Sequence, residues 1–208
     1  MKTTQLKYHA HKIVVDSDIK LNLTINKDTK LDCHSLACEY PEGDITFSED
    51  CCDGVTTIML KNDSKSLCAA FTKEWSLNIT LASTLAEFLL NAANLATDFN
   101  SGTISDIKCN FATGKMEFHG GVEFVTAKLD SAKGNYKIAV PECFDHLAIN
   151  SAIGKIALKL PSTAFIKFSE KRLMKCKEEI FGPPGADGVA PKIIDVHGAM
   201  ITTTITSN

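Results

Sequence analysis

DIKLNLTIN, residues 18–26, alternates apolar and polar side chains along its whole length. The apolar positions are Ile19, Leu21, Leu23 and Ile25. Successive side chains of an extended chain point to opposite faces, so this pattern predicts a β-strand with one buried and one solvated face.

Similar alternation recurs along the chain and favours a mainly β protein. The other segments that show it are 54–62, 73–81, 114–130, 134–140, 154–161, 163–169 and 199–206. We expect residues 114–140 to form a meander of antiparallel strands, with turns at 120–121 and 132–135 where glycine allows a tight bend.

One segment breaks the alternation: TLAEFLLNAANLATDFN, residues 84–100. Thr84 and Glu87 have the spacing of a helix capping box. Apolar residues then recur at the spacing of a helix face; they are Leu85, Phe88, Leu89, Ala92, Leu95, Ala96 and Phe99. We therefore expect an α+β fold in which antiparallel sheet layers pack on one long apolar helix, about 84–99, with short helices at 141–147 and 169–181.

The proline- and glycine-rich stretch GPPGADGVAP, residues 182–191, predicts a rigid connector. It separates an expected β-rich domain, residues 1–181, from a C-terminal strand or arm, residues 192–208. The arm is β-branched and poor in charge, which suits pairing with a neighbouring subunit. The candidate interaction residues here are Val189, Ile193, Ile194, Val196, Met200, Ile201 and Ile205.

Composition argues against several classes of protein. Arg172 is the single arginine beside 21 lysines, and no basic run is present, which disfavours nucleic-acid binding. No apolar run is long enough for a transmembrane helix, and the first residues lack a signal-peptide pattern. We expect a protein that works in the cytoplasm or in an assembly built there.

Four cysteines lie close together in residues 31–54: Cys33, Cys38, Cys51 and Cys52. Their spacing is loose for a zinc site, and two adjacent cysteines rarely both reach one tetrahedral ion. We expect reduced thiols that pack as small apolar groups, with a metal site or a redox-labile pair as the alternatives.

Two histidine patterns offer further candidates. His9 and His11 lie two residues apart, which would suit a divalent metal if a third ligand such as His119 approached. Cys143 and His146 are three residues apart, a spacing at which a nucleophile and its base could meet.

No phosphate-binding loop, dinucleotide fingerprint or zinc-protease motif is present, and we expect no cofactor. The sequence favours a non-catalytic structural or interaction protein, a β-rich subunit of a larger and possibly viral or phage-like assembly. Its partners would be further copies of itself or other subunits. A binder of apolar ligands or lipids is the alternative, and a Cys/His metal-dependent module is the second alternative.

Overall fold

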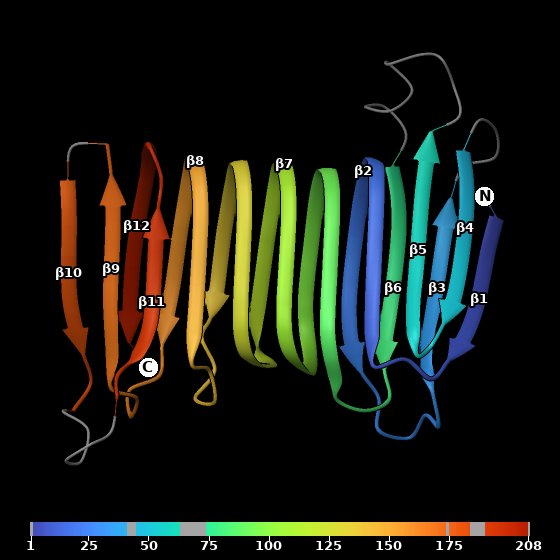
Figure 1. Cartoon of the computed structure of the whole chain (residues 1–208), viewed down its shortest axis with the longest axis horizontal. Coiled ribbons are helices and arrows are strands. Elements are labelled where there is room, and N and C mark those ends of the chain that lie inside the picture. Colours follow the sequence, from blue (N-terminus) through green and yellow to red (C-terminus); the bar gives the residue numbers. More distant parts are fainter. Residues whose placement is uncertain (1, 41–44, 63–73, 174, 184–189, 208) are drawn as a thin grey trace.

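The computed structural model describes residues 2–40, 45–62, 74–173, 175–183 and 190–207. All regular structure in these residues is β-strand (Figure 1). The strands are β1 Lys2–Tyr8, β2 Lys12–Lys27, β3 His34–Tyr40, β4 Ile45–Cys52, β5 Val55–Asn62, β6 Glu74–Leu81, β7 Leu85–Ala139, β8 His146–Leu160, β9 Ile166–Arg172, β10 Lys175–Phe181, β11 Lys192–His197 and β12 Met200–Ser207. In this part of the chain nothing qualifies as a membrane-spanning helix.

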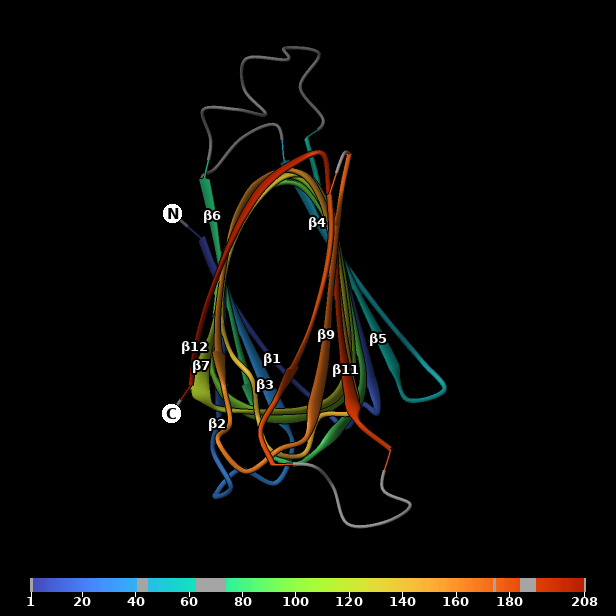
Figure 2. The ribbon, with the colours of Figure 1, turned by 90° about the vertical axis from the view of Figure 1, so that its left-hand side faces the viewer.

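The chain winds as a β-solenoid, a stack of flattened coils seen end-on in Figure 2. β2, β7 and β8 run parallel to one another, and side chains 20 residues apart hydrogen-bond from coil to coil. Each coil contributes to two opposite faces. Face A contains residues 20–25 of β2, 133–139 of β7 and β12; face B contains residues 12–17 of β2, 126–131 of β7 and β11.

Buried side chains in the middle of the molecule repeat with the 20-residue coil. Columns of equivalent residues stack along the interior: Ile104, Phe124, Phe144 and Ala164; Ile107, Ala127 and Leu147; Cys109, Leu129 and Ile149. Each fully buried large apolar side chain contributes about 1.5–3 kcal/mol relative to its exposed state. Stacking of like positions therefore stabilises the parallel register.

Aromatic rings link several coils through the core. Phe99 contacts Phe88 edge-on, with ring centroids 5.8 Å apart, and lies 4.4 Å from Phe118. Phe118 in turn meets Phe124 at 5.7 Å. Side chains thus fill the interior of these coils, and edge-to-face pairs add about 0.5–1.5 kcal/mol each beyond their burial.

The expected helix at 84–99 is wrong, because these residues form the first coil of β7. Buried positions follow steps of two along each face, with a step of three at each bend: Leu85, Phe88, Leu90, Ala92, Leu95, Thr97 and Phe99. The steps of three bring the apolar residues onto a spacing that also matches a helix. The segment at 169–181 is likewise extended, as part of β9 and β10, and residues 141–147 contain no helix.

The expected antiparallel meander at 114–140 is also wrong, because this part of β7 belongs to successive parallel coils. The glycines lie at bends of a coil. A Cβ atom on Gly114 would lie 2.2 Å from the carbonyl oxygen of Leu95, so glycine here permits close approach of neighbouring coils rather than a hairpin.

The strand predicted at 18–26 is confirmed. It lies within β2, and all four of its apolar side chains are buried. β2 is covered on its outer side by β5 and β6, which run parallel to it. β4 then pairs antiparallel with β5, β3 pairs antiparallel with β6, and β1 pairs antiparallel with β3. Figure 1 shows this N-terminal end opposite the end formed by β9 and β10.

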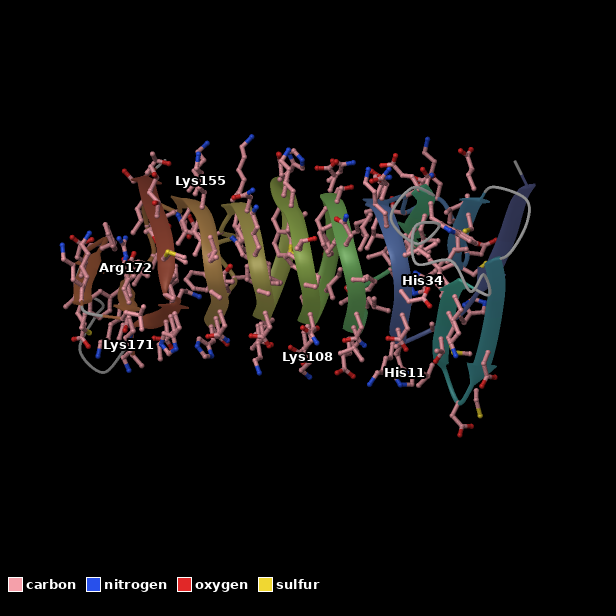
Figure 3. All side chains as sticks on the ribbon, turned by 90° about the horizontal axis from the view of Figure 1, so that it is seen from above. His11, His34, Lys108, Lys155, Lys171 and Arg172 are labelled. Atoms are coloured by element: carbon pink, nitrogen blue, oxygen red, sulfur yellow. The ribbon has the colours of Figure 1, made fainter. Side chains whose placement is uncertain are left out.

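His34 joins three parts of the N-terminal end. It is buried at 3% exposure, and Figure 3 shows it between the two faces. Its Nδ1 accepts a hydrogen bond from the Ala82 N–H at 3.1 Å, so Nε2 carries the proton and donates to Ala10 O at 2.9 Å. Burial lowers the pKa of His34, which keeps the ring neutral.

Candidate interaction surface

The C-terminal end of the solenoid carries two strands that are paired on one side only. β12 pairs in parallel with β8, from Met200 opposite Ile153 to Ser207 opposite Leu160. β10 pairs with β9 alone. Among the strands that the structure describes, none covers the outer edge of either one. Both edges therefore present unpaired backbone N–H and C=O groups.

The two edges differ in how they are protected. β10 has mostly exposed side chains, among them Lys175, Lys177 and Glu178, and charges of this kind oppose the addition of an apolar strand. β12 carries no charge: Thr202, Thr204 and other threonines line it beside isoleucine. The β12 edge is therefore the more receptive one.

Inside the solenoid, the end next to β12 is incompletely filled. A hollow of about 230 Å³ separates β12 from the β9–β10 hairpin. It is lined by the apolar Phe168, Phe181 and Ile205 and by the charged Glu170, Arg172, Lys177 and Glu179. Thr203 Oγ1 is buried beside it and has no hydrogen-bond partner in the described part of the chain. A buried hydroxyl without a hydrogen-bond partner costs free energy, so a group that hydrogen-bonds Thr203 Oγ1 would stabilise this end of the solenoid.

Face A is hollowed next to β12. A groove of about 630 Å³ crosses equivalent positions of successive coils, and its lining includes Ala139, Pro141, Ala157, Pro161, Thr204 and Thr206. Two lysines, Lys137 and Lys159, also line it. Lys137 lies 3.5 Å from Glu117, whereas Lys159 has no ion-pair partner among the residues described. Among the described residues, the groove thus offers small apolar side chains, the unpaired Lys159, and two carboxylates, Glu123 and Glu142, which each accept a hydrogen bond from a threonine hydroxyl.

Asp98, Glu117 and His119 bring three possible metal ligands within 4.8 Å of one another. His119 Nε2 lies 3.7 Å from Asp98 Oδ1. Glu117 is already engaged by Lys115 and by Lys137, and its pKa is lowered chiefly by the hydrogen bond from Lys115. A cation would have to displace those lysines, so the cluster is better described as a neutral surface network.

The cysteines considered as metal ligands have different surroundings. Cys38 is buried in the core, and burial raises its pKa to about 12. Cys33 is half-buried and Cys52 is exposed, while the side chain of Cys51 lies outside the described residues. The raised pKa of Cys38 disfavours thiolate ligation by that residue. In the described part of the chain, the Asp98 cluster is the only group of three donor residues found.

The histidine and cysteine pairs are placed as follows. His9 and His11 are exposed between β1 and β2, and the His11 ring approaches Gly54. Cys143 donates from Sγ to the carbonyl oxygen of Phe124 at 3.5 Å. His146 Nε2 instead lies 3.1 Å from Asp195 Oδ2. Cys143 and His146 thus each have a partner other than one another.

The proposed C-terminal arm is part of the solenoid, because β11 and β12 both pair with β8. Ile194, Val196 and Ile201 are buried, Ile205 is half-buried, and Ile193 and Met200 are exposed. Val189 lies outside the described residues. The exposed part of the arm is therefore the outer side and edge of β12.

Sequence reasoning missed the groove and the 20-residue coil. The signal that could have revealed the coil is the spacing of Gly114, Gly134 and Gly154, which matches that of Phe124 and Phe144. The groove has no local signature, because its lining comes from separate coils and from β12.

Comparison with known proteins bears on the fold. No family model matches the chain, and no curated protein matches it. A proposed cell adhesion protein from Clostridium sporogenes is similar in structure, with 12% identity, a TM-score of 0.56, and coverage of 100% of this chain and 99% of that one.

Two weaker likenesses cover this chain fully. One is a proposed adhesin from Bacteroides fragilis, with 13% identity, 97% of its chain covered and a TM-score of 0.41. The other is a proposed lipid-binding protein from Parabacteroides distasonis, with 11% identity, 96% of its chain covered and a TM-score of 0.37. These two scores are too low to carry an argument. At 12% identity the Clostridium structure shows a shared fold, and the chain has the β-solenoid architecture of that protein.

Proposed function

We propose that the protein is a non-catalytic interaction module that binds an extended polypeptide segment along the free edge of β12. The observation that carries this proposal is that β12 is hydrogen-bonded on one side only and carries no charge. A partner strand gains main-chain hydrogen bonds at such an edge. A subunit of a larger assembly would use the same edge to meet its neighbour.

The surroundings of β12 support side-chain specificity as well. Alternate side chains of an added strand would face inward, next to the hollow bordered by Phe168 and Phe181, or outward, beside the groove. A β-branched apolar residue would fit the inward position beside Ile205, and polar residues would suit the inward positions near Glu170 and Lys177.

Selection from a displayed random-peptide library tests the proposal with defined probes. We expect selected peptides to be β-branched and to slow amide hydrogen exchange in β12. Thr204→Lys should weaken their binding at least about tenfold, because a lysine on an edge strand opposes strand addition. Ala132→Lys adds the same charge at an exposed position on an inner coil and should leave binding unchanged.

Two results would contradict this function. One is that no peptide binds the folded protein. The other is that the bound peptides protect amides elsewhere while those of β12 exchange as before.

A second candidate function is suggested by the groove on face A. The small apolar lining beside the unpaired Lys159 would suit an amphiphile with an anionic head group, such as a fatty acid. Titration with dodecanoate should shift NMR signals of Ala139 and Ala157. Ala139→Trp should abolish those shifts by filling the groove, and Ala132→Trp should preserve them; no shifts in the unaltered protein would exclude this candidate.

A further inference from the structure

The two ends of the solenoid have matching sets of free edges. On face A the outermost strands are β1 at the N-terminal end and β12 at the C-terminal end. On face B they are β4 and β10. In the described residues each of these four strands is paired on one side only. Each end therefore offers one free edge on each face.

The strand directions at the two ends also agree. β12 runs parallel to the coils, and β1 does too, because it is antiparallel to β3, which is antiparallel to β6. β4 and β10 both run against the coils. Beyond β8, face B adds three strands (β11, β9 and β10) and face A adds β12 alone, whereas beyond β2 face A adds three (β6, β3 and β1) and face B adds two (β5 and β4). If one copy is placed after another along the axis, β10 therefore meets β4 as a parallel pair, and β12 faces β1 in the same direction with room for one strand between them.

The ends differ in the sign of their charge. Residues 28–40 and 45–61, which include β3, β4 and β5, contain six acidic residues and two lysines. β1 adds two lysines, so the N-terminal end stays acidic. Residues 153–181, which include β9, β10 and most of the last coil, contain seven basic residues and three acidic ones.

Several basic side chains at the C-terminal end are free to meet a partner. Lys167, Lys171 and Lys175 are exposed, and none of them has an ion-pair partner in the part of the chain that is described. Figure 3 shows Lys171 pointing outward near this end. On the opposite end, Asp50 of β4 is exposed. Opposite charges on neighbouring strands favour pairing, and like charges oppose it.

From these features we propose that copies of this chain bind head to tail, the basic C-terminal end of one against the acidic N-terminal end of the next. Contacts between two like ends would place like charges together, so closed two-fold dimers are disfavoured. A head-to-tail contact along the solenoid axis leaves a free end on each side and extends into a filament. This inference rests on the proposed function of the free edges and names the partner as a second copy.

Sedimentation velocity of the full chain at several protein concentrations tests the inference. At low ionic strength the average mass should rise above 22.6 kDa with concentration. It should fall back toward the single-chain value at about 0.5 M salt, where the Debye length shrinks to a few ångströms. A single-chain mass at all concentrations in low salt would overturn the inference.

A charge-swap experiment identifies the surfaces. The variant Lys175→Glu/Lys177→Glu reverses β10, and Glu49→Lys/Asp50→Lys reverses β4. Each alone should self-associate at least about tenfold more weakly, because the altered end then no longer carries a net charge opposite to that of the end it would meet. An equimolar mixture should associate again, because each reversed end meets its complement. Recovery in the mixture also shows that both variants are folded.

The matched control is Lys128→Glu/Lys133→Glu, which makes the same change in net charge at exposed positions on an inner coil. It should associate like the unaltered chain. Association that survives the β10 reversal, or a mixture that stays single-chain, would overturn the head-to-tail contact. If the protein stays a monomer but peptides bind β12, the proposed function stands and the head-to-tail association is refuted. If no peptide binds, the proposed function itself is refuted.

Discussion

Gly154 lies against the carbonyl oxygen of Gly134, its partner one coil earlier on face A. A Cβ atom on Gly154 would be 1.7 Å from that oxygen, closer than any real contact. We predict that Gly154→Ala destabilises the protein by about 1–3 kcal/mol, because the coils must separate or tilt to admit the methyl group. Urea unfolding followed by circular dichroism measures the change.

Gly120→Ala is the matched control, since nothing lies within 4 Å of the position that its Cβ would take. Its effect on the free energy of unfolding should stay within about 0.5 kcal/mol. Equal effects of the two substitutions would mean that the coils do not approach one another at Gly154.

The reactivity of each cysteine should depend on whether its side chain lies inside or outside the coils. Cys109 is buried and its pKa is raised by burial, whereas Cys143 and Cys176 are exposed. Alkylation requires the thiolate, so we predict that Cys109 reacts with iodoacetamide at least about 100-fold more slowly than Cys143 in the folded protein. Peptide mass spectrometry resolves the sites. Rapid labelling of Cys109 without denaturant would contradict the inward orientation of its side chain.

His34 should make stability depend on pH. Its folded-state pKa is lowered, so the unfolded chain binds the proton more readily. The contribution is therefore fully present above the unfolded pKa of about 6.5 and is lost as pH falls below it. We predict that the free energy of unfolding decreases between about pH 7 and pH 5 more steeply in the unaltered protein than in His34→Gln, whose amide does not titrate.

Urea unfolding of both proteins across this pH range gives the comparison, and the exposed histidines contribute equally to each. His34→Leu should cost about 1–3 kcal/mol at neutral pH, because the half-buried Ala82 N–H loses its acceptor. Identical pH profiles for the unaltered protein and His34→Gln would show that His34 is not buried neutral.

The strand at 18–26 could be predicted because its alternation is local: Ile19 and Leu21 face the core and Lys20 does not. The segment 84–99 could not, because a two-residue period interrupted by bends gives the same apolar spacing as a helix. Strand and helix are distinguished in this segment only by a long-range contact, the pairing of Leu95 with Leu21 on the neighbouring strand.

The interaction surface depends on still longer-range relations. β12 could be predicted as a β-branched strand, but its free edge follows from its pairing with β8 rather than with a following strand. The charge difference between the ends is present in the sequence. A role for this charge difference in association can be inferred only once the structure places β4 and β10 at opposite ends of the solenoid.

Nuclear Overhauser contacts between backbone protons test the solenoid most directly. The structure predicts contacts between parallel strands for residues 20 apart, such as Leu129 with Ile149 and Lys137 with Ala157. It also predicts no helical contacts between residues three apart in 84–99. Helical contacts in that segment, or close Hα–Hα contacts typical of antiparallel pairing within 114–140, would contradict the stacked parallel coils.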